Sequence, residues 1–209
     1  KSKVVVRQAD AERRVVAGDT AGVGDEVRTG WWGRALLEIR ERASRFEILP
    51  ATRVRLGGDG AGVLVMLERG RLKAVFDALA GKEERIVATP GALLAVRGTR
   101  YGVEVAADGT AVVAVFEGTV EVRPTVAAYP VTAVEAGQAC RFGPQLAPER
   151  GPLPRGVTEQ GWRGGLDGGG GQDGRGGEPG TRGSQPGAGP SSTGSPAARQ
   201  AGPGRRGGG

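Results

Sequence analysis

The chain has 209 residues, a net charge of +6, a single Cys (Cys140) and no His. This composition excludes His-dependent catalytic triads, His-based or four-Cys zinc sites and an intrachain disulfide. It predicts no catalytic site, no metal site and no cofactor. The mild positive charge is not clustered, so nucleic-acid binding is not favoured. No apolar run approaches the roughly 18 residues of a membrane span, and no signal peptide is expected in these residues.

Two parts of the chain differ sharply in composition. Residues 146–209 hold 22 of the 40 glycines and eight of the 13 prolines. Such a segment cannot bury enough apolar surface to offset the entropy lost on ordering. Residues 1–145 are long enough to enclose one hydrophobic core. The sequence therefore predicts a single domain over residues 1–145 and a disordered Gly/Pro/Arg-rich tail over residues 146–209.

Short runs with alternating apolar residues predict β-strands along the first part. In chain order they cover residues 4–6, 13–17, 35–39, 45–49, 52–56 and 63–67. Gly70 and Gly81 bracket residues 73–79 too tightly for a helix, so a strand followed by a loop is expected there. Short strands at regular spacing, with turn residues between them, are typical of an all-β antiparallel sandwich or β-roll.

Residues 101–122 give the clearest strand signal. Asp108 and Gly109 lie between two alternating runs, which predicts a hairpin with a type I′ turn. The segment Glu117-Gly118-Thr119 is expected to reverse the chain once more, into a further strand at residues 120–122.

Several motifs occur in the order found in the FecR domain of bacterial extracytoplasmic regulators, and this chain resembles a stand-alone FecR domain. The motifs are Gly24-Asp25-x-Val27-x-Thr29-Gly30, Leu67-x-x-Gly70-x-Leu72, Ala88-Thr89-Pro90, Val96-Arg97-Gly98-Thr99, Val115-x-Glu117-Gly118-x-Val120 and Gly137-Gln138. One departure is visible. Where the family usually has an Asp-Gly-Ser hairpin, this chain has Glu41-Arg42-Ala43-Ser44, so the geometry of that turn is expected to differ.

The resemblance implies a non-enzymatic module outside the cytoplasm, in the periplasm, at the cell surface or secreted. Its role would be protein interaction or regulation, in signal transduction or as a scaffold. Signalling members carry a cytoplasmic anti-sigma segment and a membrane helix before this domain, and neither is expected in this chain. The alternative is a module that binds a cell-envelope component or polysaccharide. The expected partner is accordingly a protein or an envelope component.

Candidate binding residues are Trp31, Trp32 and Arg97. Adjacent residues on a strand point to opposite faces, so one Trp is expected in the core and the other exposed as a binding anchor. Arg97 is expected to bind a partner or to pair with a neighbouring carboxylate. The remaining motif residues are expected to hold turns and bulges: Gly24, Asp25, Thr29, Gly30, Gly98, Thr99, Glu117, Gly118 and Gly137.

Overall fold

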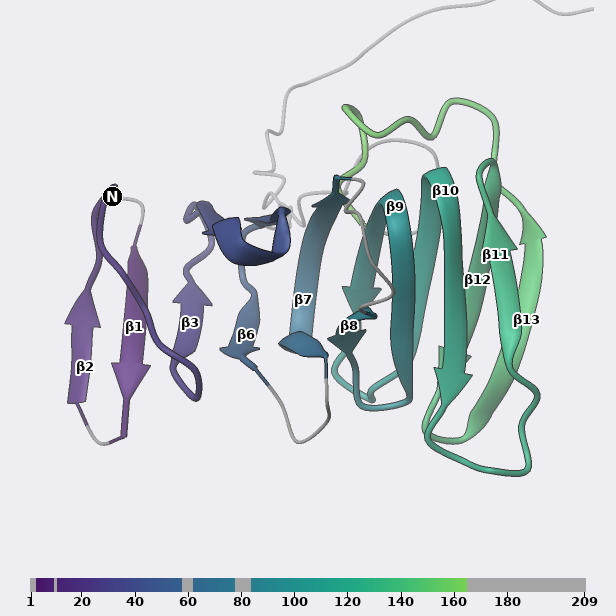
Figure 1. Ribbon diagram of the computed structural model, residues 1–209, viewed down its shortest axis with the longest axis horizontal. Coiled ribbons are helices and arrows are strands. Elements are labelled where there is room, and N and C mark those ends of the chain that lie inside the picture. The colour runs from purple at the N-terminus through teal and green to yellow at the C-terminus, as the bar shows by residue number, and fades with distance from the viewer. Residues whose placement is uncertain (1–2, 10, 58–61, 78–83, 165–209) are drawn as a thin grey trace, which may run out of the picture. The chain divides into compact units, whose positions relative to one another are not determined.

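The computed structural model describes residues 3–9, 11–57, 62–77 and 84–164. The chain divides into two compact units, Lys1–Gly171 and Gln172–Gly209, and the second lies outside the described residues. Strands account for 60% of the described residues and helix for 2%, which confirms the all-β prediction (Figure 1).

Thirteen strands and one short helix make up the described part. They are β1 (Val4–Gln8), β2 (Ala11–Arg14), β3 (Glu26–Thr29), β4 (Ala35–Ile39), the 3-10 helix η1 (Arg40–Arg42), β5 (Ser44–Ile48), β6 (Arg53–Leu56), β7 (Val63–Phe76), β8 (Arg85–Ala88), β9 (Ala92–Val105), β10 (Ala111–Pro124), β11 (Thr132–Glu135), β12 (Gln138–Gly143) and β13 (Leu146–Pro152). The strand predicted at residues 13–17 ends earlier, at Arg14.

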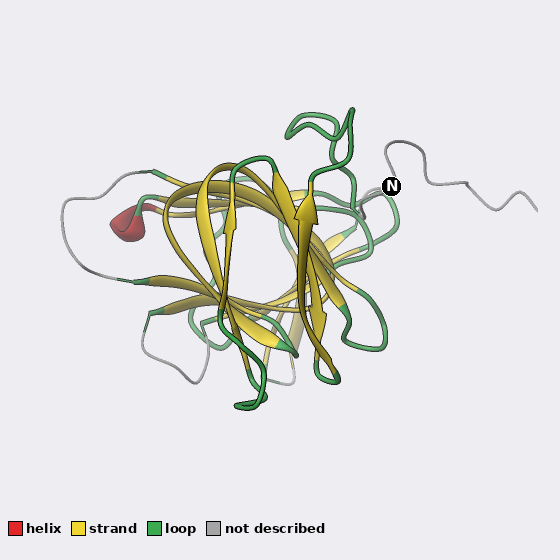
Figure 2. Cartoon of the chain, turned by 90° about the vertical axis from the view of Figure 1, so that its right-hand side faces the viewer, coloured by secondary structure: helices red, strands yellow, loops and turns green. Residues whose placement is uncertain are grey.

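All strands belong to one hydrogen-bonded sheet, in which β7 and β8 are parallel and the other described pairings are antiparallel. Three 14-residue strands, β7, β9 and β10, change neighbours halfway along. The first half of β7 pairs with β6 and β8, and its second half pairs with β5 and β9. The sheet therefore folds over at these strands into two layers, with strands on both sides of the core (Figure 2).

A glycine with positive φ lies near the middle of each long strand. Gly70, Gly98 and Gly118 have φ values of 98°, 55° and 76°. Residues with a side chain rarely adopt this backbone conformation, whereas glycine adopts it readily. The three glycines therefore let the strands bend between the layers. Gly98 was expected in a tight turn or a bulge, and the register between β9 and β10 shifts beside it. The reversal expected at Gly118 is wrong, because β10 continues through this residue and only its register with β9 shifts.

The β9–β10 hairpin is confirmed, but its turn is not type I′. The Gly109 amide donates to the Ala106 carbonyl at 3.1 Å, and the Ala106 amide donates to the Thr110 carbonyl at 2.8 Å. Gly109 has a φ of 81°, whereas Asp108 is not among the positive-φ residues. This pattern is a type I turn followed by a glycine bulge. The Asp108 carboxylate accepts from the Thr110 amide and hydroxyl, and these bonds lower its pKa.

The core is built mainly from Val and Leu, with a group of three aromatic rings. Phe76 meets Phe46 edge-on at 5.5 Å and stacks on Tyr101 at 6.0 Å. The buried Arg85 guanidinium lies over the Phe76 ring at 5.2 Å and donates to the Asp77 carbonyl at 2.8 Å. Desolvation lowers the pKa of this guanidinium. Cys140 is a fully buried member of the same core.

Replacing Tyr101 by Phe should raise the free energy of unfolding by about 1 kcal/mol. The Tyr101 hydroxyl is buried without a hydrogen-bond partner in the part of the chain that the structure describes. Burial raises its pKa, so it stays protonated. Removing an unsatisfied hydroxyl recovers its desolvation cost, about 1–3 kcal/mol, less the loss of packing around the oxygen. Urea unfolding of Tyr101→Phe checks this, and a loss of stability would mean that the hydroxyl has a partner.

Replacing Ala43 by Gly should also stabilise the domain. Ala43 ends η1 in the left-handed conformation, with φ 42° and ψ 49°, so the turn does differ from a regular hairpin. Glycine adopts this conformation without the steric cost of a Cβ, a gain of about 1 kcal/mol offset in part by the greater freedom of the unfolded chain. A melting temperature raised by a few degrees is expected. An unchanged or lower melting temperature would contradict a strained backbone conformation at Ala43.

The ordered domain extends beyond the predicted boundary at residue 145. Leu146–Pro152 forms β13, which pairs with β12, and Trp162 is only 2% exposed. The indole packs on Leu49 and Ala114, on the outer side of the sheet, in a cluster separate from the main core. Isolated apolar residues in a Gly/Pro-rich segment gave no periodic signal, so the prediction placed the boundary too early. The predicted tail beyond Gly164 lies outside the described residues.

Candidate binding surface

A tight turn after β3 presents the two adjacent tryptophans. The Gly33 amide donates to the Gly30 carbonyl at 2.9 Å, which closes a turn with Trp31 and Trp32 at its two central positions. The Gly30 amide donates to the Lys3 carbonyl at 2.8 Å. A Cβ on Gly33 would come within 2.5 Å of that same carbonyl oxygen. The turn is therefore packed closely against the start of β1.

Thr29 fixes the base of this turn. Its buried hydroxyl donates to the Leu49 carbonyl at 2.6 Å and accepts from the Thr52 amide at 3.0 Å. The Ala51 amide donates to the Gly30 carbonyl at 3.1 Å. These bonds join the end of β3 to the connection between β5 and β6. They therefore fix the position of the turn that carries the two tryptophans.

Both indole rings face solvent. Trp31 is 83% exposed and Trp32 is 81% exposed. The expectation that one ring would enter the core is wrong, because the pair lies in a turn after the strand and the alternation of strand side chains does not apply. One Trp was expected at the surface, and the structure places both there.

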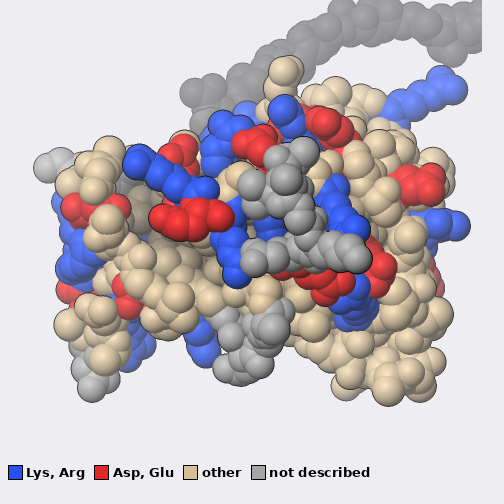
Figure 3. Space-filling view, in the orientation of Figure 1, with Lys and Arg blue, Asp and Glu red and all other residues tan. Residues whose placement is uncertain are grey.

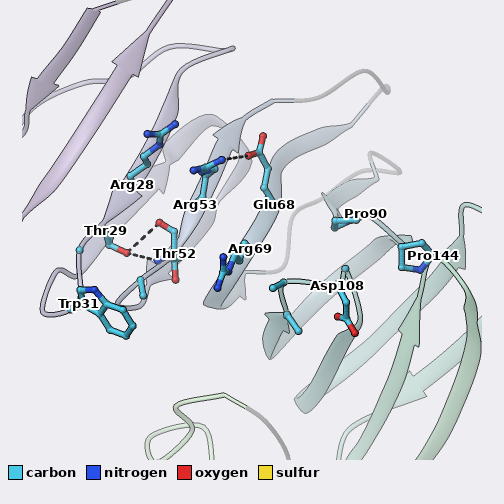
Figure 4. Close-up of a pocket in the computed structure, with 15 residues that line it drawn as sticks. Arg28, Thr29, Trp31, Thr52, Arg53, Glu68, Arg69, Pro90, Asp108 and Pro144 are labelled. Carbon is cyan, nitrogen blue, oxygen red and sulfur yellow. Dashed lines mark hydrogen bonds and ion pairs between the residues drawn. The ribbon is translucent and has the colours of Figure 1, made fainter. Parts of the chain in front are cut away.

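An open cleft of about 730 Å³ lies beside Trp31 (Figure 4). One side is formed by the end of β3 and by β6 and β7. The other side is formed by three turns, at Pro90, at residues 106–109 and at Pro144. Sequence reasoning did not find this cleft, because its residues come from six separate segments. The only available signal was that Asp108-Gly109 marks a turn.

The remaining motif residues make contacts within the domain. The buried Asp25 carboxylate accepts from the Gly22 amide at 2.9 Å, and the Gly24 amide donates to the Leu56 carbonyl at 2.7 Å. Glu117 pairs with Arg100 at 3.0 Å beside the bulge. The Gly137 amide donates to the Val115 carbonyl at 2.9 Å.

Arg97 lies apart from the tryptophan turn. It lines a polar groove with Thr119, Glu84, Glu121 and Arg123. Arg123 is held by Glu84 at 2.7 Å and by Glu121 at 2.5 Å. Arg97 contributes to lowering the pKa of Glu84, after the larger effect of Arg123. The structure therefore places Arg97 beside carboxylates, on a surface separate from Trp31 and Trp32.

Neither a metal site nor a helix long and apolar enough to cross a membrane occurs among the residues that the structure describes. On the face drawn in Figure 3, acidic side chains lie among the basic ones.

Comparison with known proteins agrees with the fold and the motifs. Residues 25–121 match the family described as FecR protein, which confirms the predicted FecR resemblance over this part of the chain. No curated protein matches the chain.

Two crystal structures described as a "putative anti-sigma factor" from Parabacteroides distasonis ATCC 8503 are similar to this chain, each with a TM-score of 0.51 and with identities of 17% and 18%. Each similarity covers 61% of this chain and 59% of the other. At this identity the similarity establishes the fold.

Proposed function

We propose that this FecR domain is a non-enzymatic interaction module of an extracytoplasmic regulatory system, and that it binds a protein partner through the Trp31-Trp32 turn. The match to the FecR family supports a regulatory role, and the description of the two structural neighbours as anti-sigma factors agrees with it. The observation that carries the proposal is the exposure of two adjacent indole rings on a turn fixed by backbone hydrogen bonds.

The two indole rings of Trp31 and Trp32 present a large apolar area to water. A buried Trp removes a large apolar area from solvent, so an exposed pair is a costly surface unless a partner covers it. Trp is enriched among the residues that contribute most to protein–protein binding. Only 4% of this chain is aromatic, and two of its three Trp lie side by side on the surface.

A second candidate function is binding of a cell-envelope polysaccharide. The observation that favours it is the position of Trp31 at the cleft, together with Asp108 and Glu68. An indole face stacks on the C–H groups of a sugar ring, and carboxylates accept from its hydroxyls. This candidate uses Trp31 but leaves Trp32 without a role, since Trp32 does not line the cleft.

Replacing Trp31 or Trp32 by Ala should leave the domain folded. Because each ring is more than four-fifths exposed, the free energy of unfolding should change by no more than about 0.5 kcal/mol. Thermal unfolding of the two variants checks this. A melting temperature lowered by 10 °C or more in both would show that the pair contributes to the fold rather than to a binding surface.

Photo-crosslinking in the source cells tests the function itself. Trp31 or Trp32 is replaced by p-benzoylphenylalanine, an aromatic for an aromatic, and the exposed Arg40 of η1 serves as the control position. A discrete protein adduct from positions 31 and 32, absent from position 40, is the expected result. Two results together would favour the polysaccharide function instead. The adducts would be removed by glycan hydrolases, and the purified chain would co-sediment with cell-wall sacculi.

A further inference from the structure

The cleft beside Trp31 has a charge that its own residues leave unbalanced. Three arginines and two carboxylates line it, and both carboxylates are already engaged. Glu68 accepts from Arg55 at 2.6 Å and lies 3.9 Å from Arg53. Asp108 accepts from the amide and the hydroxyl of Thr110 within its own turn. Neither acid forms an ion pair with Arg69 in the part of the chain that the structure describes.

The three arginines differ in their partners. Arg28 pairs with Glu26, and Arg53 lies 3.6 Å from the same carboxylate. Arg69 is exposed and has no ion pair or hydrogen bond from its side chain among the residues that the structure describes. It lies on the β7 side of the cleft, and Figure 4 draws it between Trp31 and the side that carries Pro90 and Pro144. Its guanidinium offers five donors in a planar fork that matches a carboxylate.

Apolar surfaces stand on both sides of Arg69. Trp31 lies at one side of the cleft, and Pro90 and Pro144 lie at the other (Figure 4). A volume of about 730 Å³ is large enough for several residues of an extended chain. A partner segment that crosses the cleft would therefore meet an apolar surface, a cation and a second apolar surface in turn.

We infer that the cleft binds an extended segment of the partner protein that carries an acidic side chain between apolar residues. The carboxylate pairs with Arg69. The flanking apolar residues contact Trp31 on one side and Pro90 and Pro144 on the other. This inference rests on the proposed function, because it names the chemistry of the partner that the Trp31-Trp32 turn contacts.

Selection from a random library of 12-residue peptides displayed on phage, against the immobilised full chain, tests the inference. The selected peptides are expected to contain Asp or Glu next to an aromatic residue, Leu or Pro. Synthetic copies labelled with fluorescein are then titrated by anisotropy. Arg69→Glu should weaken binding at least tenfold and Arg69→Gln less, while the matched surface variant Arg40→Glu should bind like the original chain. Replacing the acidic residue of the peptide by its amide should weaken binding to a similar extent as Arg69→Gln.

Selected peptides without an acidic residue, or equal affinity for Arg69→Glu and the original chain, would overturn the inference. So would polygalacturonate, an anionic polysaccharide, if it bound through Arg69 and displaced the peptides at lower concentration. The melting temperature of Arg69→Glu shows whether a loss of binding comes from unfolding. If crosslinking captures a protein whose binding Arg69→Glu leaves unchanged, the cleft inference fails and the proposed function stands. If the peptides bind through Arg69 but crosslinking yields no protein adduct, the cleft inference stands and the proposed function fails.

Discussion

Replacing Trp162 by Ala should destabilise the domain by about 3–5 kcal/mol, the range for a buried aromatic truncated in a packed cluster. The ring is 2% exposed and packs on Leu49 and Ala114, with Leu153 and Val157 beside it. The melting temperature should fall by roughly 6–20 °C. Trp31→Ala is the matched control, because it removes the same side chain from an exposed position. Equal melting temperatures for the two variants would contradict the placement of Trp162.

A substitution at Gly102 tests the packing of the Trp162 ring against β9. A Cβ on Gly102 of β9 would lie 2.6 Å from the Trp162 ring, so the ring must move if residue 102 has a side chain. Gly102→Ala should therefore destabilise the original domain and cost much less in the Trp162→Ala background. Additive effects of the two changes would mean that the ring and Gly102 do not touch. The same double-variant comparison tests whether the domain extends beyond residue 145.

Replacing Gly118 by Ala should destabilise the domain by about 2–4 kcal/mol. Its φ of 76° costs an L-residue about 1–2 kcal/mol, and the new Cβ would also lie 2.5 Å from the Gly98 carbonyl oxygen. Relief of that contact requires the backbone of β9 or β10 to shift at the bend between the layers.

Gly98→Ala provides the matched control for this effect. Gly98 has a φ of 55°, but a Cβ there would meet nothing within 4 Å. The cost should therefore be that of the backbone conformation alone, about 1 kcal/mol. Chemical denaturation measures both variants. A larger loss for Gly98→Ala than for Gly118→Ala would contradict the geometry of the paired bulges.

The sequence predicted the strands and the family because both depend on local signals. Alternating apolar residues marked β4, β5 and β6 within one or two residues, and the Asp108-Gly109 pair marked the β9–β10 hairpin. The type of turn was wrong, since Asp-Gly also suits a type I turn followed by a glycine bulge. Gly118 was taken for a chain reversal, because a left-handed glycine serves a turn and a bulge equally well. Only pairing with β9 distinguishes the two.

The features that depend on distant contacts could not be predicted. Trp162 has no periodic apolar neighbours, and its burial depends on Gly102, 60 residues earlier in the chain. The cleft brings together Arg69, Pro90 and Pro144, which no spacing in the sequence connects. The exposure of both Trp31 and Trp32 follows from the hydrogen bonds between Gly30, Gly33 and Lys3, which place the pair in a turn.

The central claim is that two tryptophans form a binding surface on a domain that folds without them. The most direct test is a titration of the protein captured from position 31 against the original chain and against Trp31→Ala and Trp32→Ala, each shown by melting to be folded. The proposal predicts affinities about 5–30-fold weaker for the variants, which corresponds to about 1–2 kcal/mol, with melting temperatures nearly unchanged. Equal affinities for all three proteins, or a loss of binding that appears only where the variant has unfolded, would contradict it.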